Sequence, residues 1–197
     1  MAVNRLFRTC PTTGLKFHQP AEALMKANAV AAVVFLLVGG ILAILVTLTR
    51  WQAVHLLPAD WFYLVLTGHG LNMLVFWIIF FEIAVLYFAG STLLGCRLPT
   101  PRLGWLGFGL MLIGALMNNF AVFIRQDSSV MFTSYAPMQA HWSFYLGLIL
   151  FAVGARVPRT LLSRPAAFSL LVMFSRYFFD TCCLWAMSLR CTGPSVP

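Results

Sequence analysis

The chain has 197 residues, of which 61% are hydrophobic and 9% charged, and its mean hydropathy is +0.88. Soluble domains carry about 25% charged residues, so this composition excludes an ordinary soluble domain and indicates an integral membrane protein in contact with lipid. The formal net charge is +8, but the Lys and Arg residues are dispersed between apolar blocks, which argues against a nucleic-acid partner.

The first 26 residues are polar and basic and precede any apolar run. A cleaved signal peptide has a short charged start followed at once by an apolar stretch, so this segment does not match one. We therefore interpret residues 1–26 as a basic flank that remains attached to the first membrane helix.

Four apolar segments are long enough to cross a bilayer, because about 20 helical residues span its hydrocarbon core. They predict an all-α, polytopic membrane helix bundle with four transmembrane helices. Together they form a four-helix module over residues 27–157. The segments are about Ala27 to Leu48, Trp61 to Leu94, Leu103 to Phe123, and His141 to Val157.

Residues 158–197 form an irregular tail that departs from this pattern. The tail contains an apolar stretch, but Arg176 and Asp180 lie in its middle. A charge at the centre of a span costs about 2.5 to 3.5 kcal/mol, unless the two side chains pair at their i, i+4 spacing. The tail forms a fifth span only if these two charges pair. Three of the five cysteines lie here, and no CxxC pair occurs anywhere in the chain.

The loop charges predict the orientation, because cytoplasmic loops carry an excess of Lys and Arg. The N-terminal flank is basic, and the loop between the second and third segments contains Arg97 and Arg102 without an acid. The first and third loops each balance one arginine with one aspartate. We expect the N-terminus to lie in the cytoplasm.

His69 lies inside the second apolar segment, about eight residues from its start and therefore about 12 Å deep. Ionisable residues inside spans are rare and usually functional. One interpretation is an interior imidazole that only packs and hydrogen-bonds. The other is an axial haem ligand, since haem iron binds a neutral imidazole whose second nitrogen is held by an acceptor. The small residues Thr67, Gly68 and Gly70 would give a flat macrocycle access to the backbone.

An aromatic and aliphatic wall follows His69 and would suit a porphyrin, although such stripes also arise from plain helix packing. None of the other histidines, His18, His55 and His141, is a convincing second ligand. The chain lacks HxxxH and HExxH motifs, which argues against a zinc or copper site. The wall residues are Leu74, Phe76, Trp77, Phe80 and Phe81.

Glu82 lies further along the same segment, about 20 Å from His69 by helical rise. A carboxyl group buried without a partner is neutral at pH 7. It would either relay protons or hydrogen-bond as an uncharged acid at a helix interface.

Three sequence blocks resemble the N-terminal third of catalytic subunit I of haem-copper terminal oxidases. They are LTGHGLNMLVFW, GCRLPTPRLGWLGF and SYAPMQAHWSFYLGLILF, and the resemblance covers about residues 20–157. The third block is most similar to the B-type branch. Nitric oxide reductases share the histidine and the apolar FW stretch of the second segment. The B-type pattern consists of Tyr135, Pro137, His141, Trp142, Tyr145 and Gly147.

The resemblance implies that His69 is one of two axial ligands of a low-spin haem. No other ligand transfers, and no catalytic residue does, since the copper centre and the second haem occur only in a complete oxidase. Such an enzyme passes electrons from a cytochrome c or small copper protein to oxygen and translocates protons. The implied partners are other oxidase subunits or the remaining part of subunit I, in a prokaryotic plasma membrane.

Members of this family continue with further regular spans, so the resemblance implies that the tail is either a fifth span or a frameshifted end. The chain alone would be incomplete as an enzyme, so other functions stay open. One is a small b-type cytochrome or membrane anchor that shares His69 with a second polypeptide. Another is a fragment of a nitric oxide reductase. A third is a helical assembly subunit or carrier in which His69 only packs.

Overall fold

The computed structural model describes residues 7–93, 95, 97, 98, 100–124 and 140–161, with side chains as far as Pro158. The expected fifth span and almost all of the tail lie outside the described residues. So do the charges of the third loop and the first two residues of the B-type pattern.

The described part of the chain is mainly helical, as the hydropathy pattern predicts. The second apolar segment is one continuous rod in which one π-helical segment interrupts the α-helix and a second one ends it. The helices are α1 (Gln19–Arg50), α2 (Ala59–Leu71), η2 (Asn72–Phe76), α3 (Trp77–Phe88), η3 (Ala89–Leu93), α4 (Pro101–Phe123) and α5 (Trp142–Leu161).

Within the described residues, three helical rods have the length and hydropathy of a membrane crossing, namely 19–50, 59–93 and 101–123. They contain the first three predicted segments almost completely. The fourth predicted segment is also helical, but the apolar part of α5 covers only Trp142–Pro158. The structure thus contains at least three helices of membrane-spanning length.

Prolines fix where the rods begin. Pro20 and Pro101 lie in the first turns of α1 and α4, and Pro58 directly precedes α2. A proline in the first turn loses no helical hydrogen bond, because that N–H would lack an intrahelical partner in any residue. The helix α1 therefore starts at Gln19, well before the apolar run at about Ala27.

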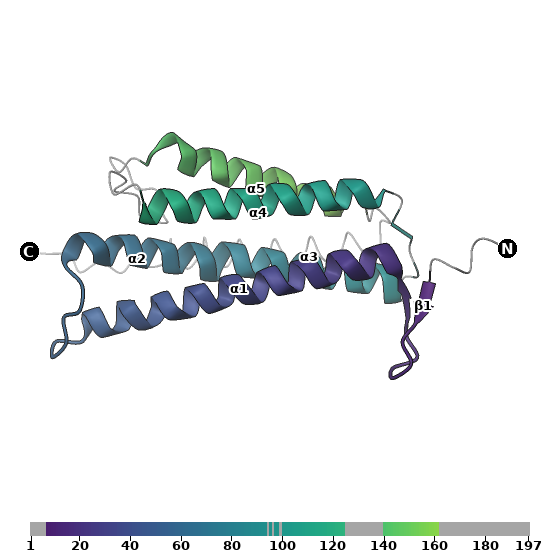
Figure 1. The fold of residues 1–197 in the computed structure, drawn as a ribbon, viewed down its shortest axis with the longest axis horizontal. Coiled ribbons are helices and arrows are strands. Elements are labelled where there is room, and N and C mark those ends of the chain that lie inside the picture. The colour runs from purple at the N-terminus through teal and green to yellow at the C-terminus, as the bar shows by residue number, and fades with distance from the viewer. Residues whose placement is uncertain (1–6, 94, 96, 99, 125–139, 162–197) are drawn as a thin grey trace, which may run out of the picture. The chain divides into compact units, whose positions relative to one another are not determined.

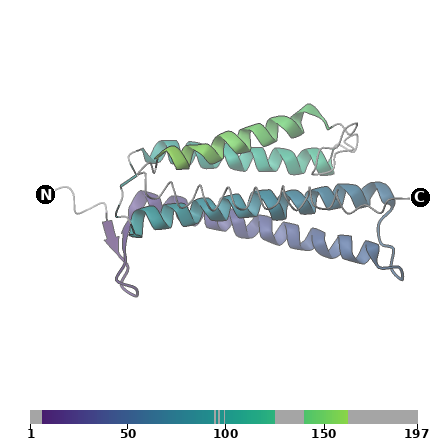
Figure 2. The same cartoon turned by 180° about the vertical axis from the view of Figure 1, so that it is seen from behind.

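The helices pack as two sets, one formed by α1 and the 59–93 rod and the other by α4 and α5. The rod formed by α2, η2 and α3 runs antiparallel to α1, and α4 lies beside α5 (Figures 1 and 2). Four phenylalanine rings join the two sets. Phe35 of α1 stacks on Phe80 of α3 with centroids 5.4 Å apart, and Phe151 of α5 meets Phe76 and Phe80 at 5.0 and 5.6 Å.

Glycines bring α4 and α5 into backbone contact. A Cβ built on Gly114 would lie 2.5 Å from the carbonyl oxygen of Gly147, and one built on Gly154 would lie 2.6 Å from that of Gly107. Small residues are favoured at membrane helix interfaces because they let backbones approach closely. The contacts also show that the two helices are antiparallel.

A β-hairpin precedes α1 and is the one departure from an all-α fold in the described residues. The strands β1 (Phe7–Thr9) and β2 (Lys16–His18) pair antiparallel, and Gly14 between them has a φ of +68°. The sequence predicted only a basic flank in this region. Three-residue strands are too short for an alternating pattern to identify them.

The turn of the hairpin sets the acidity of Cys10. Hydrogen bonds from the side chain and backbone of Thr13, and then from Thr12, lower the pKa of its thiol from 9.0 to about 7.

We expect iodoacetamide to alkylate Cys10 with a rate midpoint near pH 7, in a chain whose other cysteines are serine. Thr13→Val should raise that midpoint because the largest cause is removed; an unchanged profile would contradict the assignment.

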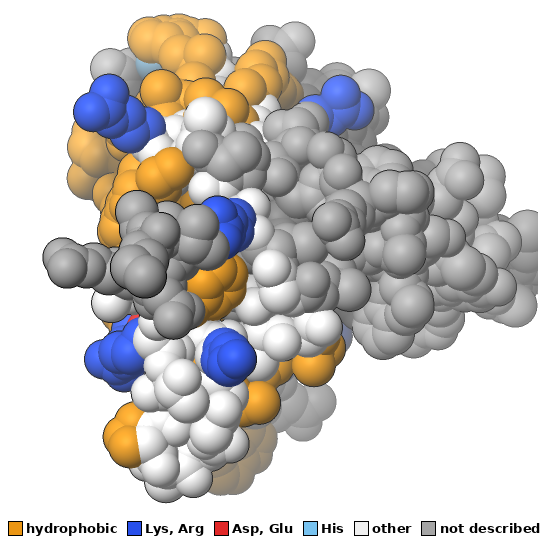
Figure 3. Space-filling view, turned by 90° about the vertical axis from the view of Figure 1, so that its right-hand side faces the viewer, with side chains coloured by type: hydrophobic (Ala, Val, Ile, Leu, Met, Phe, Trp, Pro, Cys, Tyr) orange, Lys and Arg blue, Asp and Glu red, His pale blue; other side chains and the backbone are white. Residues whose placement is uncertain are grey.

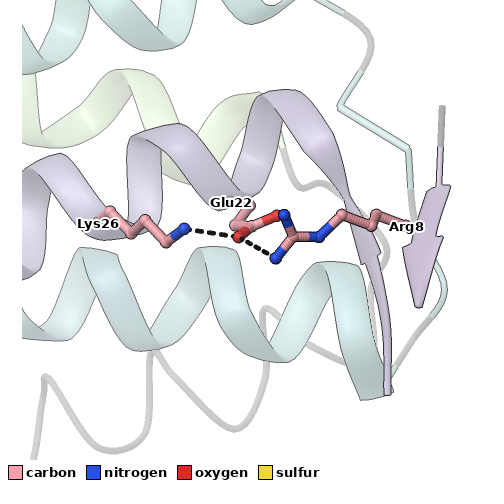
Figure 4. Close-up of polar contacts among 3 residues, drawn as sticks. All are labelled: Arg8, Glu22 and Lys26. Atoms are coloured by element: carbon pink, nitrogen blue, oxygen red, sulfur yellow. Dashed lines mark hydrogen bonds and ion pairs between the residues drawn. The ribbon is translucent and has the colours of Figure 1, made fainter. Parts of the chain in front are cut away.

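The hairpin is tied to α1 by one acidic residue. Glu22 Oε1 lies 2.6 Å from Lys26 Nζ and 3.4 Å from an Arg8 guanidinium nitrogen (Figure 4). The two basic side chains are more than half exposed. Exposed ion pairs contribute only about 0 to 1 kcal/mol, so this cluster orients the hairpin more than it stabilises the fold.

Candidate haem-ligand site

His69 lies in the last turn of α2 and is half-buried. Its Nδ1 is 2.9 Å from the backbone carbonyl oxygen of Gly39 on α1. A carbonyl oxygen only accepts hydrogen bonds, so Nδ1 carries the proton and donates it. In a neutral ring this tautomer leaves the lone pair on Nε2, which is the form of imidazole that binds a metal.

The contact depends on a close approach between α1 and the rod that follows His69. A Cβ built on Gly39 would lie 2.7 Å from both Cγ and Sδ of Met73 and 3.3 Å from Cβ of Asn72. The adjacent Gly40 has nothing within 4 Å of such a Cβ. Of these two glycines, Gly39 is therefore the one that makes the packing contact.

Replacing each glycine of the pair tests this assignment. Gly39→Leu should lower the free energy of unfolding by about 1 to 3 kcal/mol, because the added atoms overpack the contact with Met73 and Asn72. Gly40→Leu is the matched control and should leave stability unchanged or raise it, since leucine favours helix. Denaturation in mixed detergent micelles measures both. Equal effects at the two positions would contradict the assignment.

The helix widens directly after His69. Asn72 begins the π-helix η2, and its backbone N–H is shared between the carbonyls of Gly68 and His69. Its side-chain Nδ2 donates to the Gly68 carbonyl at 2.7 Å. Single π-helical turns inside α-helices occur frequently at functional sites. Here the wider turn begins three residues after the candidate ligand.

Asn72 also links this turn to α4. Its Nδ2 donates to Asn119 Oδ1 at 2.8 Å, and Asn119 Nδ2 lies 3.4 Å from Asn72 Oδ1. Asn72 is fully buried, so this amide pair holds α4 against the rod that carries His69. Sequence reasoning missed both residues, although polar side chains inside apolar spans are themselves a signal of function.

A double-mutant cycle should measure this link. Asn72→Leu and Asn119→Leu each leave a partner amide without its interhelical bond, so each single change should destabilise the fold. The double variant should lose less free energy of unfolding than the two single variants lose together. The difference, which is the coupling energy, should be about 1 kcal/mol, as for other hydrogen bonds between membrane helices. Unfolding in mixed micelles provides the four free energies. Additive effects would show that the pair is not coupled.

Two of the three small residues that were expected to give a macrocycle access, Thr67 and Gly68, do not do so. Gly68 is buried, and a Cβ there would lie 2.5 Å from the ring of Phe123 and 3.3 Å from Leu42. Thr67 is also buried and donates to the Tyr63 carbonyl at 2.8 Å. Gly68 therefore serves packing between helices, because Phe123 of α4 and Leu42 of α1 lie against it.

The predicted aromatic wall divides between two environments. Phe76 and Phe80 are fully buried in the cluster with Phe35 and Phe151 and form part of the core. Leu74 and Phe81 are about half exposed, and Trp77 contacts Phe81 with ring centroids 5.4 Å apart. The wall is therefore not one continuous surface beside His69.

The other titratable residues lie on separate elements. His18 ends β2, His55 is exposed in the loop before α2, and His141 precedes α5 with its Nδ1 2.8 Å from Ser143 Oγ. Glu82 is half-buried on α3. Within the part of the chain that the structure describes, no three His, Cys, Asp or Glu side chains gather as a metal-binding cluster.

Comparisons with known proteins identify the family. The family described as cytochrome c and quinol oxidase polypeptide I matches residues 23–194, which extends past the 20–157 covered by the sequence blocks. Cytochrome c oxidase subunit 1 of Thermus thermophilus is 32% identical over 97 residues, covering 49% of this chain and 17% of that protein.

A solved structure agrees with this match. The cryo-EM structure of a haem-copper terminal oxidase dimer is 25% identical, with a TM-score of 0.60. The similarity covers 70% of this chain and 24% of that one, so this chain spans less than a quarter of the length of both relatives. Because the family match extends over most of its residues, the chain belongs to the cytochrome c and quinol oxidase polypeptide I family.

Proposed function

We propose that this chain forms an N-terminal helical module of a haem-copper terminal oxidase subunit I, and that His69 supplies one axial ligand of its low-spin haem. The observation that carries the proposal is the 2.9 Å contact between His69 Nδ1 and the Gly39 carbonyl. Metal-binding histidines commonly donate their second N–H to an acceptor in this way, which fixes the tautomer and raises the basicity of the ligating nitrogen.

The residues present fit a haem ligand in their chemistry. His69 offers Nε2 as the ligating atom, and Gly39 holds the ring through Nδ1. The pair Asn72 and Asn119 braces the helix directly after the ligand. A bound haem would supply the one-electron redox chemistry, whereas the protein groups orient the ligand and tune it.

The complete enzyme would contain further helices, a second haem and copper. It would take electrons from a cytochrome c or a small copper protein and pass them to oxygen, with translocation of protons. Family membership supports haem and copper as cofactors and other oxidase subunits as partners. Since no copper ligand transfers to this chain, we expect it to show no oxygen reduction by itself.

In the proposed arrangement, α1, the 59–93 rod, α4 and α5 all cross a prokaryotic plasma membrane. The end that carries the hairpin lies in the cytoplasm, as the distribution of Lys and Arg favours. The third sequence block favours a B-type subunit within the family.

Haem binding by the full chain tests the proposal. The purified chain in detergent is titrated with ferrous haem b under carbon monoxide, which fills the second axial position so that one histidine is enough. We expect one equivalent to bind and to give the spectrum of a histidine-ligated carbonyl complex. A spectrum identical to that of haem in empty micelles would overturn the proposal. A six-coordinate low-spin haem without carbon monoxide would instead favour a b-type cytochrome.

A further inference from the structure

One end of the described helices gathers positive charge from several separate segments. This end contains the hairpin, the start of α1, the end of η3, the start of α4 and the last turns of α5 (Figure 1). Contacts between β2 and η3, and between Leu24 of α1 and Gly104 of α4, bring these segments together. The exposed basic residues here are Arg8, Lys16, Lys26, Arg97, Arg102 and Arg156.

The hairpin is packed onto this end, so its charges have a defined place. Phe17 meets Phe88 of α3 with ring centroids 6.1 Å apart, and Phe7 meets the buried His18 at 5.3 Å. The Arg97 guanidinium lies 5.9 Å from the centroid of the Phe7 ring. Such cation–π contacts hold an arginine over an aromatic face while its N–H groups stay available to other partners.

Little negative charge offsets these cations. Among the described residues at this end the one acidic side chain is Glu22, which is engaged by Arg8 and Lys26. Figure 3 views this end and shows Lys and Arg side chains spread across it between hydrophobic ones. Burial, and then the charge of Arg97, lower the pKa of His18, so that imidazole adds no positive charge at neutral pH.

The opposite end differs. Its described charges are Arg50, the last residue of α1, and Asp60 in the first turn of α2. The cationic excess is therefore a property of the hairpin end and not of the whole surface. In the proposed membrane arrangement the hairpin end lies at the bilayer surface, where basic side chains next to a membrane helix meet lipid headgroups.

We infer that the hairpin end is a binding surface for the headgroups of anionic phospholipids, with Lys16, Arg97 and Arg102 as its principal contacts. These three side chains are exposed, have no carboxylate partner among the described contacts, and come from three segments around one end. Basic residues next to a membrane helix attract anionic lipids, and the attraction falls off within a Debye length. The inference does not depend on haem binding.

Spin-labelled lipids test this surface. The full chain is reconstituted in phosphatidylcholine bilayers with a trace of spin-labelled phosphatidylglycerol or phosphatidylcholine, and electron paramagnetic resonance gives the fraction of each lipid held at the protein. We expect phosphatidylglycerol to be favoured about twofold to fivefold, and the preference to fall as salt is added. Equal association of the two lipids with the wild-type chain would overturn the inference.

Variants locate the site. Lys16→Gln combined with Arg97→Gln and Arg102→Gln should reduce the preference to about one. The charge-preserving pair Arg97→Lys and Arg102→Lys should retain it. Arg50→Gln, the matched control at the opposite end, should leave it unchanged. A preference that survives the triple change, or that Arg50→Gln abolishes, would overturn the assignment.

Discussion

The His69→Ala chain should lose the histidine-ligated haem spectrum that the wild-type chain gives under carbon monoxide. Its apparent affinity for haem b should fall about 100-fold or more, because loss of a ligand exceeds the 10- to 100-fold effect of losing a supporting group. Alanine also removes the hydrogen bond to Gly39, but α2 keeps its own backbone bonds. The fold should therefore survive, and circular dichroism checks that it does.

Two comparisons distinguish ligation from general disruption. Added imidazole should restore the spectrum of the His69→Ala chain, since it supplies the missing nitrogen to the same haem. His55→Ala and His141→Ala are the control variants and should bind haem as the wild-type chain does. If one of these controls lost the spectrum while His69→Ala kept it, the ligand assignment would be wrong.

Gly114→Ala should separate α4 from α5. The new Cβ would lie 2.5 Å from the Gly147 carbonyl oxygen and 2.7 Å from the Phe151 backbone nitrogen. Both atoms belong to the backbone, so no side chain can rotate away and the helices themselves must move. We expect a loss of about 3 kcal/mol in the free energy of unfolding, at the upper end of typical overpacking costs.

Gly109 provides the matched control on the same helix, because a Cβ there would meet nothing within 4 Å. Gly109→Ala should leave stability unchanged or raise it by up to about 1 kcal/mol through helix propensity. Unfolding in mixed micelles measures both variants, and a disulfide-trapping pair across α4 and α5 reports their separation. Comparable stability of the two variants would exclude the backbone contact as the cause.

Hydropathy predicted most of the helical framework because lipid contact demands long apolar runs. The 59–93 rod and α4 begin within two residues of the predicted segments. The helix α1 begins earlier, since Pro20 starts a helix whose first turns carry Glu22 and Lys26. Hydropathy detects only the apolar part of such a helix, so it places the boundary too late.

The surroundings of His69 were harder to predict. The residue itself was found because an imidazole in an apolar run is unusual. The Gly39 acceptor was not found, since every residue has a carbonyl and no sequence pattern marks the one that a histidine will meet. The pairing of Asn72 with Asn119 joins residues 47 positions apart, and its identification needed the packing of the helices.

The hydrogen bond from His69 to Gly39 has a consequence for how the chain tolerates mutation. The acceptor is a main-chain atom, so any residue at position 39 keeps the carbonyl, and the bond is lost when the spacing between α1 and α2 changes. Substitutions that alter this spacing need not touch the imidazole. Variants at Met73, which lies against Gly39, should therefore resemble ligand mutants in phenotype, while comparison of side chains alone would class them as remote and neutral.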